Sequence, residues 1–127
     1  MKLIEVASNL DKYVVENWIE PLNVNLADVP FDSSSMDKWI RVRYSPSSSN
    51  LIGLDGNKGR EELVGIYRVT AYARYRKTSL VVADDVKAML DGLILNNIVL
   101  DFGNVREPID LDNNVYATDV SFTVRAY

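Results

Sequence analysis

The chain of 127 residues contains neither cysteine nor histidine. Disulfide bonds, thiol chemistry and the usual zinc sites need these side chains, so their absence excludes all three. Cysteine nucleophiles and histidine general bases are excluded for the same reason. A catalytic mechanism would have to rest on carboxylates, lysine or serine, and no such constellation stands out. The sequence therefore predicts no catalytic residues, no metal ligands and no cofactor, and we expect a protein that is not an enzyme.

Long apolar runs and an excess of basic residues are also missing. No segment approaches the length of a transmembrane helix, and the polar residues within the apolar N-terminal segment argue against a signal peptide. The 14 basic and 18 acidic residues give a net charge of −4, which disfavours a generic nucleic-acid binder. Length and composition fit one soluble domain spanning residues 1–127, made and kept in a cytoplasm or assembled from one.

Two segments have the spacing of amphipathic helices. Apolar residues recur at intervals of three and four in residues 2–18, and Pro21 ends this pattern. Residues 79–93 have the same spacing, and Thr78 or Ser79 is the predicted N-cap. The expected buried stripes are Leu3, Ala7, Leu10, Val14 and Trp18 in the first helix and Val82, Val86, Met89, Leu90 and Leu93 in the second.

Alternation of apolar and polar residues predicts the strands. The longest alternating segment is 62–76, and residues 46–60, rich in turn formers, are predicted to be a mobile loop before it. Further strands are expected at 22–27, 39–45, 98–102 and 115–127, with 39–45 antiparallel to 62–76. The order of elements predicts an α+β fold, in which two helices pack on one face of a mostly antiparallel or mixed sheet.

An irregular stretch, residues 28–38, precedes the strand at 39–45. Pro30 fixes its backbone, and its serines favour local hydrogen bonds over strand pairing. We predict that Phe31 pins this stretch to the body of the protein. Trp39 is expected to anchor the strand that follows.

Three short patterns resemble binding or catalytic motifs but lack features that those motifs need. Residues 53–59, "GLDGNKG", lack the ending of a phosphate-binding loop and the helix that follows one. Residues 110–114, "DLDNN", lack the glycine and distal glutamate of a calcium loop. Ser47–Ser49 and Lys58 lie in the predicted mobile loop, where a nucleophile would not be held in tight geometry. Flexible loops and solvated turns explain all three patterns.

Four arginines lie at alternate positions of two strands that we expect to pair: Arg41, Arg43, Arg74 and Arg76. Their guanidinium groups could gather on one side of the sheet near its end. One interpretation is a solvated face whose charges discourage unwanted strand pairing. The other is a subunit or tube interface, because arginine forms bidentate pairs with carboxylates. In the second case the acidic surface of the next subunit in a head-to-tail ring would be the partner.

The order of elements and several short motifs resemble the tail terminator proteins of long-tailed bacteriophages, also called tail completion or minor tail proteins. Asp28 stands where the family has asparagine, and "YRKTS" replaces a glycine-rich turn before the second helix. The matching residues are Asp28, Val29, Pro30 and Phe31; Trp39, Ile40, Arg41 and Val42; Gly59 and Arg60; "VGIYRVTAY" at 64–72; and Ala83, Asp84, Val86 and Leu90.

This resemblance implies a structural subunit of the virion. Such proteins form a ring, commonly a hexamer, at the head-proximal end of the tail tube, and they are assembled in the bacterial cytoplasm. The implied partners are further copies of the chain, the tail tube protein and a head–tail connector protein, with DNA passing through the ring and no membrane involved. A head-completion or connector protein is the alternative within virions. A small ligand-binding α+β module is the alternative outside them.

Overall fold

The structure is a computed structural model that describes residues 1–20, 23–52 and 60–127. Within these residues, two helices and eight strands follow one another in the order α1, β1–β3, α2, β4–β8. Their bounds are α1 Leu3–Asn17, β1 Val24–Asn25, β2 Lys38–Ile52, β3 Arg60–Ala73, α2 Arg76–Leu90, β4 Ile94–Leu95, β5 Ile98–Leu100, β6 Asn104–Val105, β7 Ile109–Leu111 and β8 Val115–Ala126.

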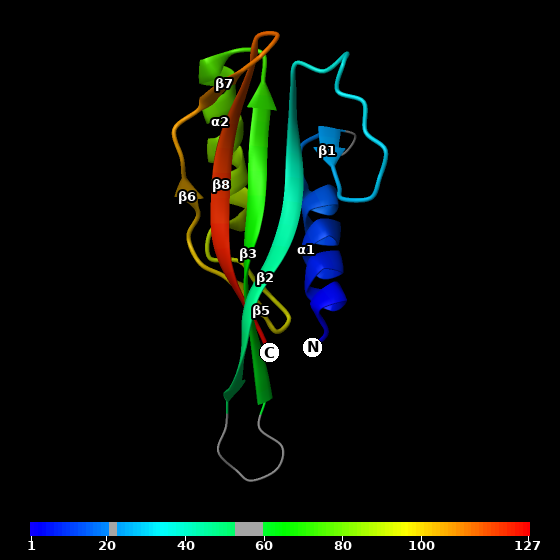
Figure 1. Ribbon diagram of the computed structural model, residues 1–127, viewed down its shortest axis with the longest axis vertical. Coiled ribbons are helices and arrows are strands. Elements are labelled where there is room, and N and C mark those ends of the chain that lie inside the picture. The colour runs from blue at the N-terminus through cyan, green and yellow to red at the C-terminus, as the bar shows by residue number, and fades with distance from the viewer. Residues whose placement is uncertain (21–22, 53–59) are drawn as a thin grey trace.

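All eight strands belong to one mixed sheet with the order β1-β2-β3-β8-β5-β4. The β1–β2 pair is parallel and the other pairs are antiparallel. The short strands β5, β6 and β7 each pair with a different part of β8. Figure 1 shows β2, β3 and β8 as the long central strands, with the β2–β3 hairpin extending below both chain termini.

Both helices cover the same face of this sheet. Side chains from α1 and α2 share one hydrophobic core with the inward-facing residues of β2, β3, β5 and β8. The largest fully buried side chains include Leu10 of α1, Leu90 of α2, Tyr67 of β3 and Phe122 of β8. The α+β prediction, with two helices on one face of a mixed sheet, is thus confirmed. No helix of the described chain covers the second face of the sheet (Figure 1).

The buried stripe of α1 differs from the prediction at its first turn. Val6, Leu10, Val14 and Trp18 are buried, whereas Leu3 is 46% exposed. The first turn lies beside the β2–β3 hairpin rather than under the core, and Leu3 borders an open groove there. The stripe of α2 was predicted more closely, since Val82, Val86 and Leu90 are buried with Met89 and Leu93 packed at the margin.

The prediction of a loop at 46–60 is wrong for residues 46–52 and for residue 60. β2 continues to Ile52, and β3 begins at Arg60 opposite it. Pairing continues because it rests on backbone hydrogen bonds, which serine-rich segments form as well as apolar ones. Pro46 is accommodated at a shift of register between Pro46 and Ser48, on a stretch of β2 that β1 does not reach. Residues 53–59 lie outside the described residues, and so does the rejected phosphate-loop pattern.

The second helix begins three residues earlier than predicted. Tyr75 is its N-cap residue and gives no side-chain cap, so neither Thr78 nor Ser79 has the predicted role. Ser79 is instead fully buried: its hydroxyl donates to the carbonyl oxygen of Ala71 at 2.9 Å and lies 2.7 Å from the hydroxyl of Thr118. This buried polar pair joins α2 to β3 and β8. Because β3 ends at Ala73, the prediction of a strand through residue 76 is also wrong.

Candidate interface surface

Three arginines share the open face of the sheet. Arg41 and Arg43 of β2 are both exposed, and Arg68 of β3 stands directly opposite Arg43 in the antiparallel register. Arg41 stands opposite Thr70 in the same ladder. None of the three arginines forms an ion pair with any residue in the described part of the chain. We call Arg41, Arg43 and Arg68 the arginine face.

A shallow groove of about 270 Å³ crosses this face from β2 to β7. The arginine face lines one side of the groove, and Leu111 lines the other. Asp119 is the one carboxylate among the described lining residues, and its Oδ1 accepts a hydrogen bond from the Thr70 hydroxyl at 2.7 Å. The arginine guanidinium groups thus face solvent across a groove that also has apolar surface.

Like charges directly opposite each other on neighbouring strands destabilise a sheet. Arg43 and Arg68 form such a pair at the described register, and no described carboxylate neutralises either one. This arrangement does not stabilise an isolated monomer. An anionic partner would remove the repulsion, so the geometry suits the binding of carboxylates or phosphates.

Arg74 lies elsewhere and has internal partners. Its guanidinium group donates to the carbonyl oxygens of Met36 and Ser33, both at 3.2 Å, and lies 5.1 Å from the ring centroid of Trp39. The Trp39 ring in turn stacks on Tyr72 with a centroid distance of 5.3 Å. Arg74 thus fastens the irregular stretch before β2 to the open face of the sheet. Trp39, 7% exposed, lies within this stack.

Arg76 and Phe31 also lie apart from the arginine face. Arg76 is the first residue of α2, and its guanidinium group is 3.6 Å from the exposed Glu107 carboxylate. The expectation that it lies on a strand is therefore wrong. Phe31 is half-buried in the irregular stretch. Of the four arginines selected from the sequence, the structure places only Arg41 and Arg43 side by side, and their nearest cationic companion is Arg68.

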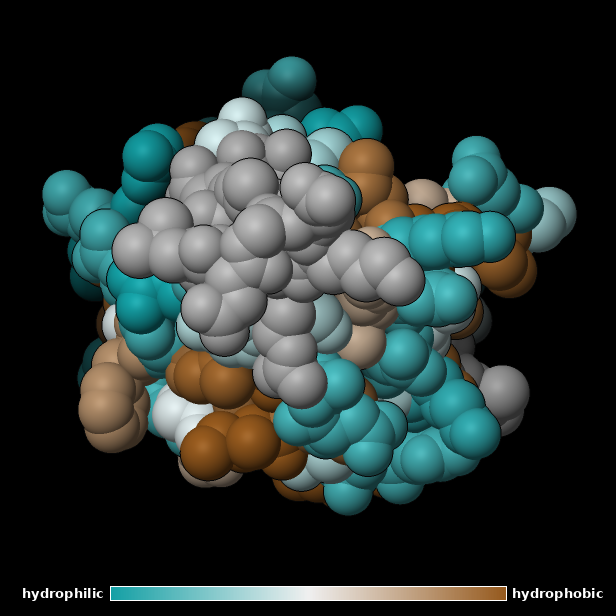
Figure 2. Space-filling model, turned by 90° about the horizontal axis from the view of Figure 1, so that it is seen from below, coloured by the Kyte–Doolittle hydropathy of each residue, from teal (hydrophilic) through white to brown (hydrophobic). Residues whose placement is uncertain are grey.

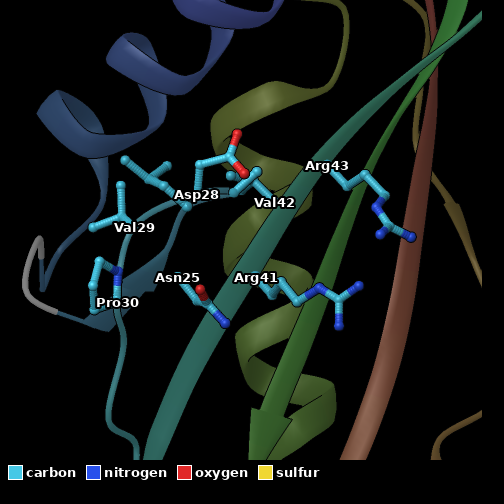
Figure 3. A pocket seen from close by; sticks show the side chains of 9 residues that line it. Asn25, Asp28, Val29, Pro30, Arg41, Val42 and Arg43 are labelled. Atoms are coloured by element: carbon cyan, nitrogen blue, oxygen red, sulfur yellow. The ribbon is translucent and has the colours of Figure 1, made fainter.

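A second hollow, of about 560 Å³, lies at the free edge of β2. Residues 25–30 form one wall and Arg41–Arg43 the other. Asp28 lies in this wall with a φ of 64°, in the left-handed region. Figure 3 shows that the side chains of Arg41 and Arg43 extend away from residues 25–30, across β2 and toward β3. Their guanidinium groups therefore belong to the open face rather than to the edge hollow.

A third hollow, of about 670 Å³, lies between the start of α1 and the β2–β3 hairpin. Its lining includes Leu3, Ile4, Pro46 and Leu63. In the view from below, brown hydrophobic areas interrupt a largely teal surface (Figure 2). Exposed apolar side chains are thus present at this end of the molecule. No observation identifies what would cover them.

The rejected calcium-loop pattern at 110–114 forms the end of β7 and the turn that leads into β8. Asn113 and Asn114 adopt left-handed conformations there, with φ of 65° and 57°, as asparagine in tight turns often does. Within residues 1–20, 23–52 and 60–127, no group of three or more acidic residues is arranged to hold a metal ion. No helix in these ranges is long and apolar enough to cross a membrane.

Comparisons with known proteins find similar structures but no similar sequence. No family model matches the chain, and no curated protein matches it. One solved structure, whose name states no function, aligns with a TM-score of 0.73 at 12% identity, covering 100% of this chain and 96% of its own. Another comes from the virion of a native gene transfer agent particle and aligns with a TM-score of 0.58 at 15% identity, covering 95% and 96%. The chain therefore shares its fold with a chain from a virion particle.

Proposed function

We propose that this chain is a structural virion protein that forms a ring on the end of a tail tube and stops tube growth. The observation that carries the proposal is the full-length agreement in fold with a chain of a gene transfer agent virion. The resemblance of its sequence motifs to tail terminator proteins supports the tail position. In this role the ring is a hexamer, has no enzymatic activity, and presents a surface for the head–tail connector while DNA passes through it.

The sheet has the features that head-to-tail assembly needs. β2 runs beyond its short pairing with β1, so most of one edge is unpaired within the described chain. The opposite side ends in the short strands β4, β6 and β7. Two different edges on opposite sides of one subunit suit a heterologous contact, and such contacts close into rings when the rotation permits. The arginine face lies beside the first edge.

The test combines the purified protein with tail tube subunits of the same virus. Tube length is measured by negative-stain electron microscopy with and without this protein. We expect short tubes with ring density at one end, and long uncapped tubes when the protein is left out. Unchanged tube growth with no density at either end would contradict the proposal. Binding to head connectors but not to tubes would favour the head-completion alternative.

A further inference from the structure

The arginine face presents three positive charges that form no ion pair within the described chain. Arg43 and Arg68 are directly opposed, and Arg41 is two residues along the same strand. All three lie on β2 or on its neighbour β3, beside the stretch of β2 that β1 leaves unpaired. A partner that approaches this edge can therefore reach the guanidinium groups.

The opposite side of the sheet presents a short acidic and apolar segment, Ile109–Asp112. β7 pairs with β8 along one edge only, and all three of its residues are exposed. Ile109 and Leu111 are 55% and 40% exposed, although both are large apolar side chains. Asp110 and Asp112 alternate with them and form no ion pair with another described residue. Because successive side chains of a strand point to opposite faces, the segment presents its carboxylates and its apolar side chains on different sides.

We propose that the arginine face of one subunit binds segment Ile109–Asp112 of a second copy of the chain, head to tail. This inference rests on the proposed ring and names the surfaces that join its subunits. Charge complementarity favours this occupant, since two unpaired carboxylates meet three unpaired guanidinium groups. The arginines also lie beside Tyr72 and Ala117, which add apolar surface to the groove.

A nucleic-acid backbone is a poorer fit to the same groove. The chain carries a net charge of −4, and Asp119 lies among the groove residues. A continuous phosphate backbone would meet this carboxylate, and it would have no use for the apolar side chains.

Charge reversal on both surfaces tests the pairing directly. The basic variant is Arg41→Glu with Arg43→Glu and Arg68→Glu, and the acidic-segment variant is Asp110→Arg with Asp112→Arg. Each variant alone has like charges at every contact between its copies, so we expect its self-association to weaken at least about tenfold. In an equimolar mixture the two variants can alternate, and every contact then has opposite charges. By the same reasoning, the dissociation constant of the mixture should return to within about threefold of the wild-type value.

Sedimentation velocity over a concentration series measures the association, and thermal melting shows that each variant folds. Carbodiimide cross-linking of Arg43→Lys adds a contact readout, since it joins the new amine to a carboxylate in direct contact. We expect a cross-link between residue 43 and Asp110 or Asp112 of another copy. Ser8→Lys, at an exposed position on α1 outside the proposed contact, is the control for non-specific cross-linking.

Wild-type association that survives in both variants overturns the inference. So does failure of the mixture to recover, or the absence of any self-association and cross-link at high concentration. Salt-dependent DNA binding that the basic variant loses, while self-association stays unchanged, overturns it in favour of a nucleic acid. If the tubes described above are capped normally while these results are negative, the proposed function stands and only the assigned subunit contact fails.

Discussion

The two faces of the sheet have opposite character, although they are built from the same three long strands. On the helix side, Tyr67, Val69 and Phe122 are fully buried. On the open side, Arg43, Arg68 and Thr123 are exposed neighbours of those residues. One face holds the core together, whereas the other contributes little burial and keeps charges without partners.

This difference separates the residues that fold the protein from those available to a partner. Burial of a large apolar side chain contributes about 1.5–3 kcal/mol, whereas exposed substitutions usually change stability by about 0.5 kcal/mol or less. Selection for folding alone does not require three arginines on adjacent strands. We therefore attribute the helix-side face to stability and the open face to association.

Substitution at adjacent positions of β8 gives the largest expected contrast. Phe122→Ala removes a fully buried aromatic ring and leaves a cavity, and we expect a loss of about 3–5 kcal/mol in unfolding free energy. Thr123→Ala, one residue along and exposed, should change it by about 0.5 kcal/mol or less. Denaturant titration measures both. Equal losses would break the distinction between the two faces.

The buried hydroxyl pair tests how polar groups are tolerated on the helix side. Ser79→Ala or Thr118→Val alone removes a hydrogen bond at a fully buried position and should cost about 1–3 kcal/mol. The double variant replaces both partners and should lose less than the sum of the two single changes. A double-mutant cycle by denaturant titration measures this coupling. Simple additivity would mean that the hydroxyl contact contributes no coupling.

Arg74 and Arg76 differ in their contacts, so their substitutions should have different effects on stability. Arg74→Ala removes two hydrogen bonds and the contact with the Trp39 ring, so we expect a loss of about 1–2 kcal/mol. Arg76→Ala removes one exposed ion pair and should change stability by about 0.5 kcal/mol or less. Thermal melting of both variants provides the measurement. If the two values are reversed, Arg74 does not fasten the stretch before β2.

Asp11 gives a smaller, pH-dependent effect on the helix side. Burial raises the pKa of its carboxyl group, and the hydrogen bond from the Tyr67 hydroxyl at 2.7 Å partly offsets this. Because the folded-state pKa is raised, the contribution of Asp11 to stability is full below the unfolded pKa and is lost as the pH rises through the folded pKa.

The control for this effect is Asp11→Asn, which keeps a hydrogen-bond acceptor but does not titrate. The unfolding free energy of wild type should fall relative to this variant as the pH rises from acid toward neutral. Denaturant titrations at matched pH values test the direction. A rise of wild type relative to Asp11→Asn would show that the hydrogen bond, rather than burial, dominates the pKa of Asp11.

Period-two alternation in the sequence predicted which side of β3 is buried. Leu63, Tyr67, Val69, Ala71 and Ala73 share one parity within the alternating segment 62–76, and all are buried. The strand ends were missed, because the serine-rich part of β2 pairs through its backbone and shows no alternation. The early start of α2 was missed because no capping side chain marks it.

The arginine face could be predicted only in part. Arg41 and Arg43 were selected because they alternate on one strand, but their partner on β3 depends on register. Register is fixed by the length of the connection and by irregularities such as the shift after Pro46, which alternation does not reveal. Arg68 was visible as a polar residue of the alternating segment. Its position opposite Arg43 became apparent only from the pairing.

Hydrogen–deuterium exchange of the assembled and dissociated protein tests the central claim most directly. Exchange rates report which backbone amides become protected when copies associate. We predict that protection increases in β2 around residues 41–45 and in segment Ile109–Asp112, with no increase along α1 or α2. Increased protection on the exposed sides of the helices, with residues 41–45 and the segment unchanged, would contradict the assignment of the open face to assembly.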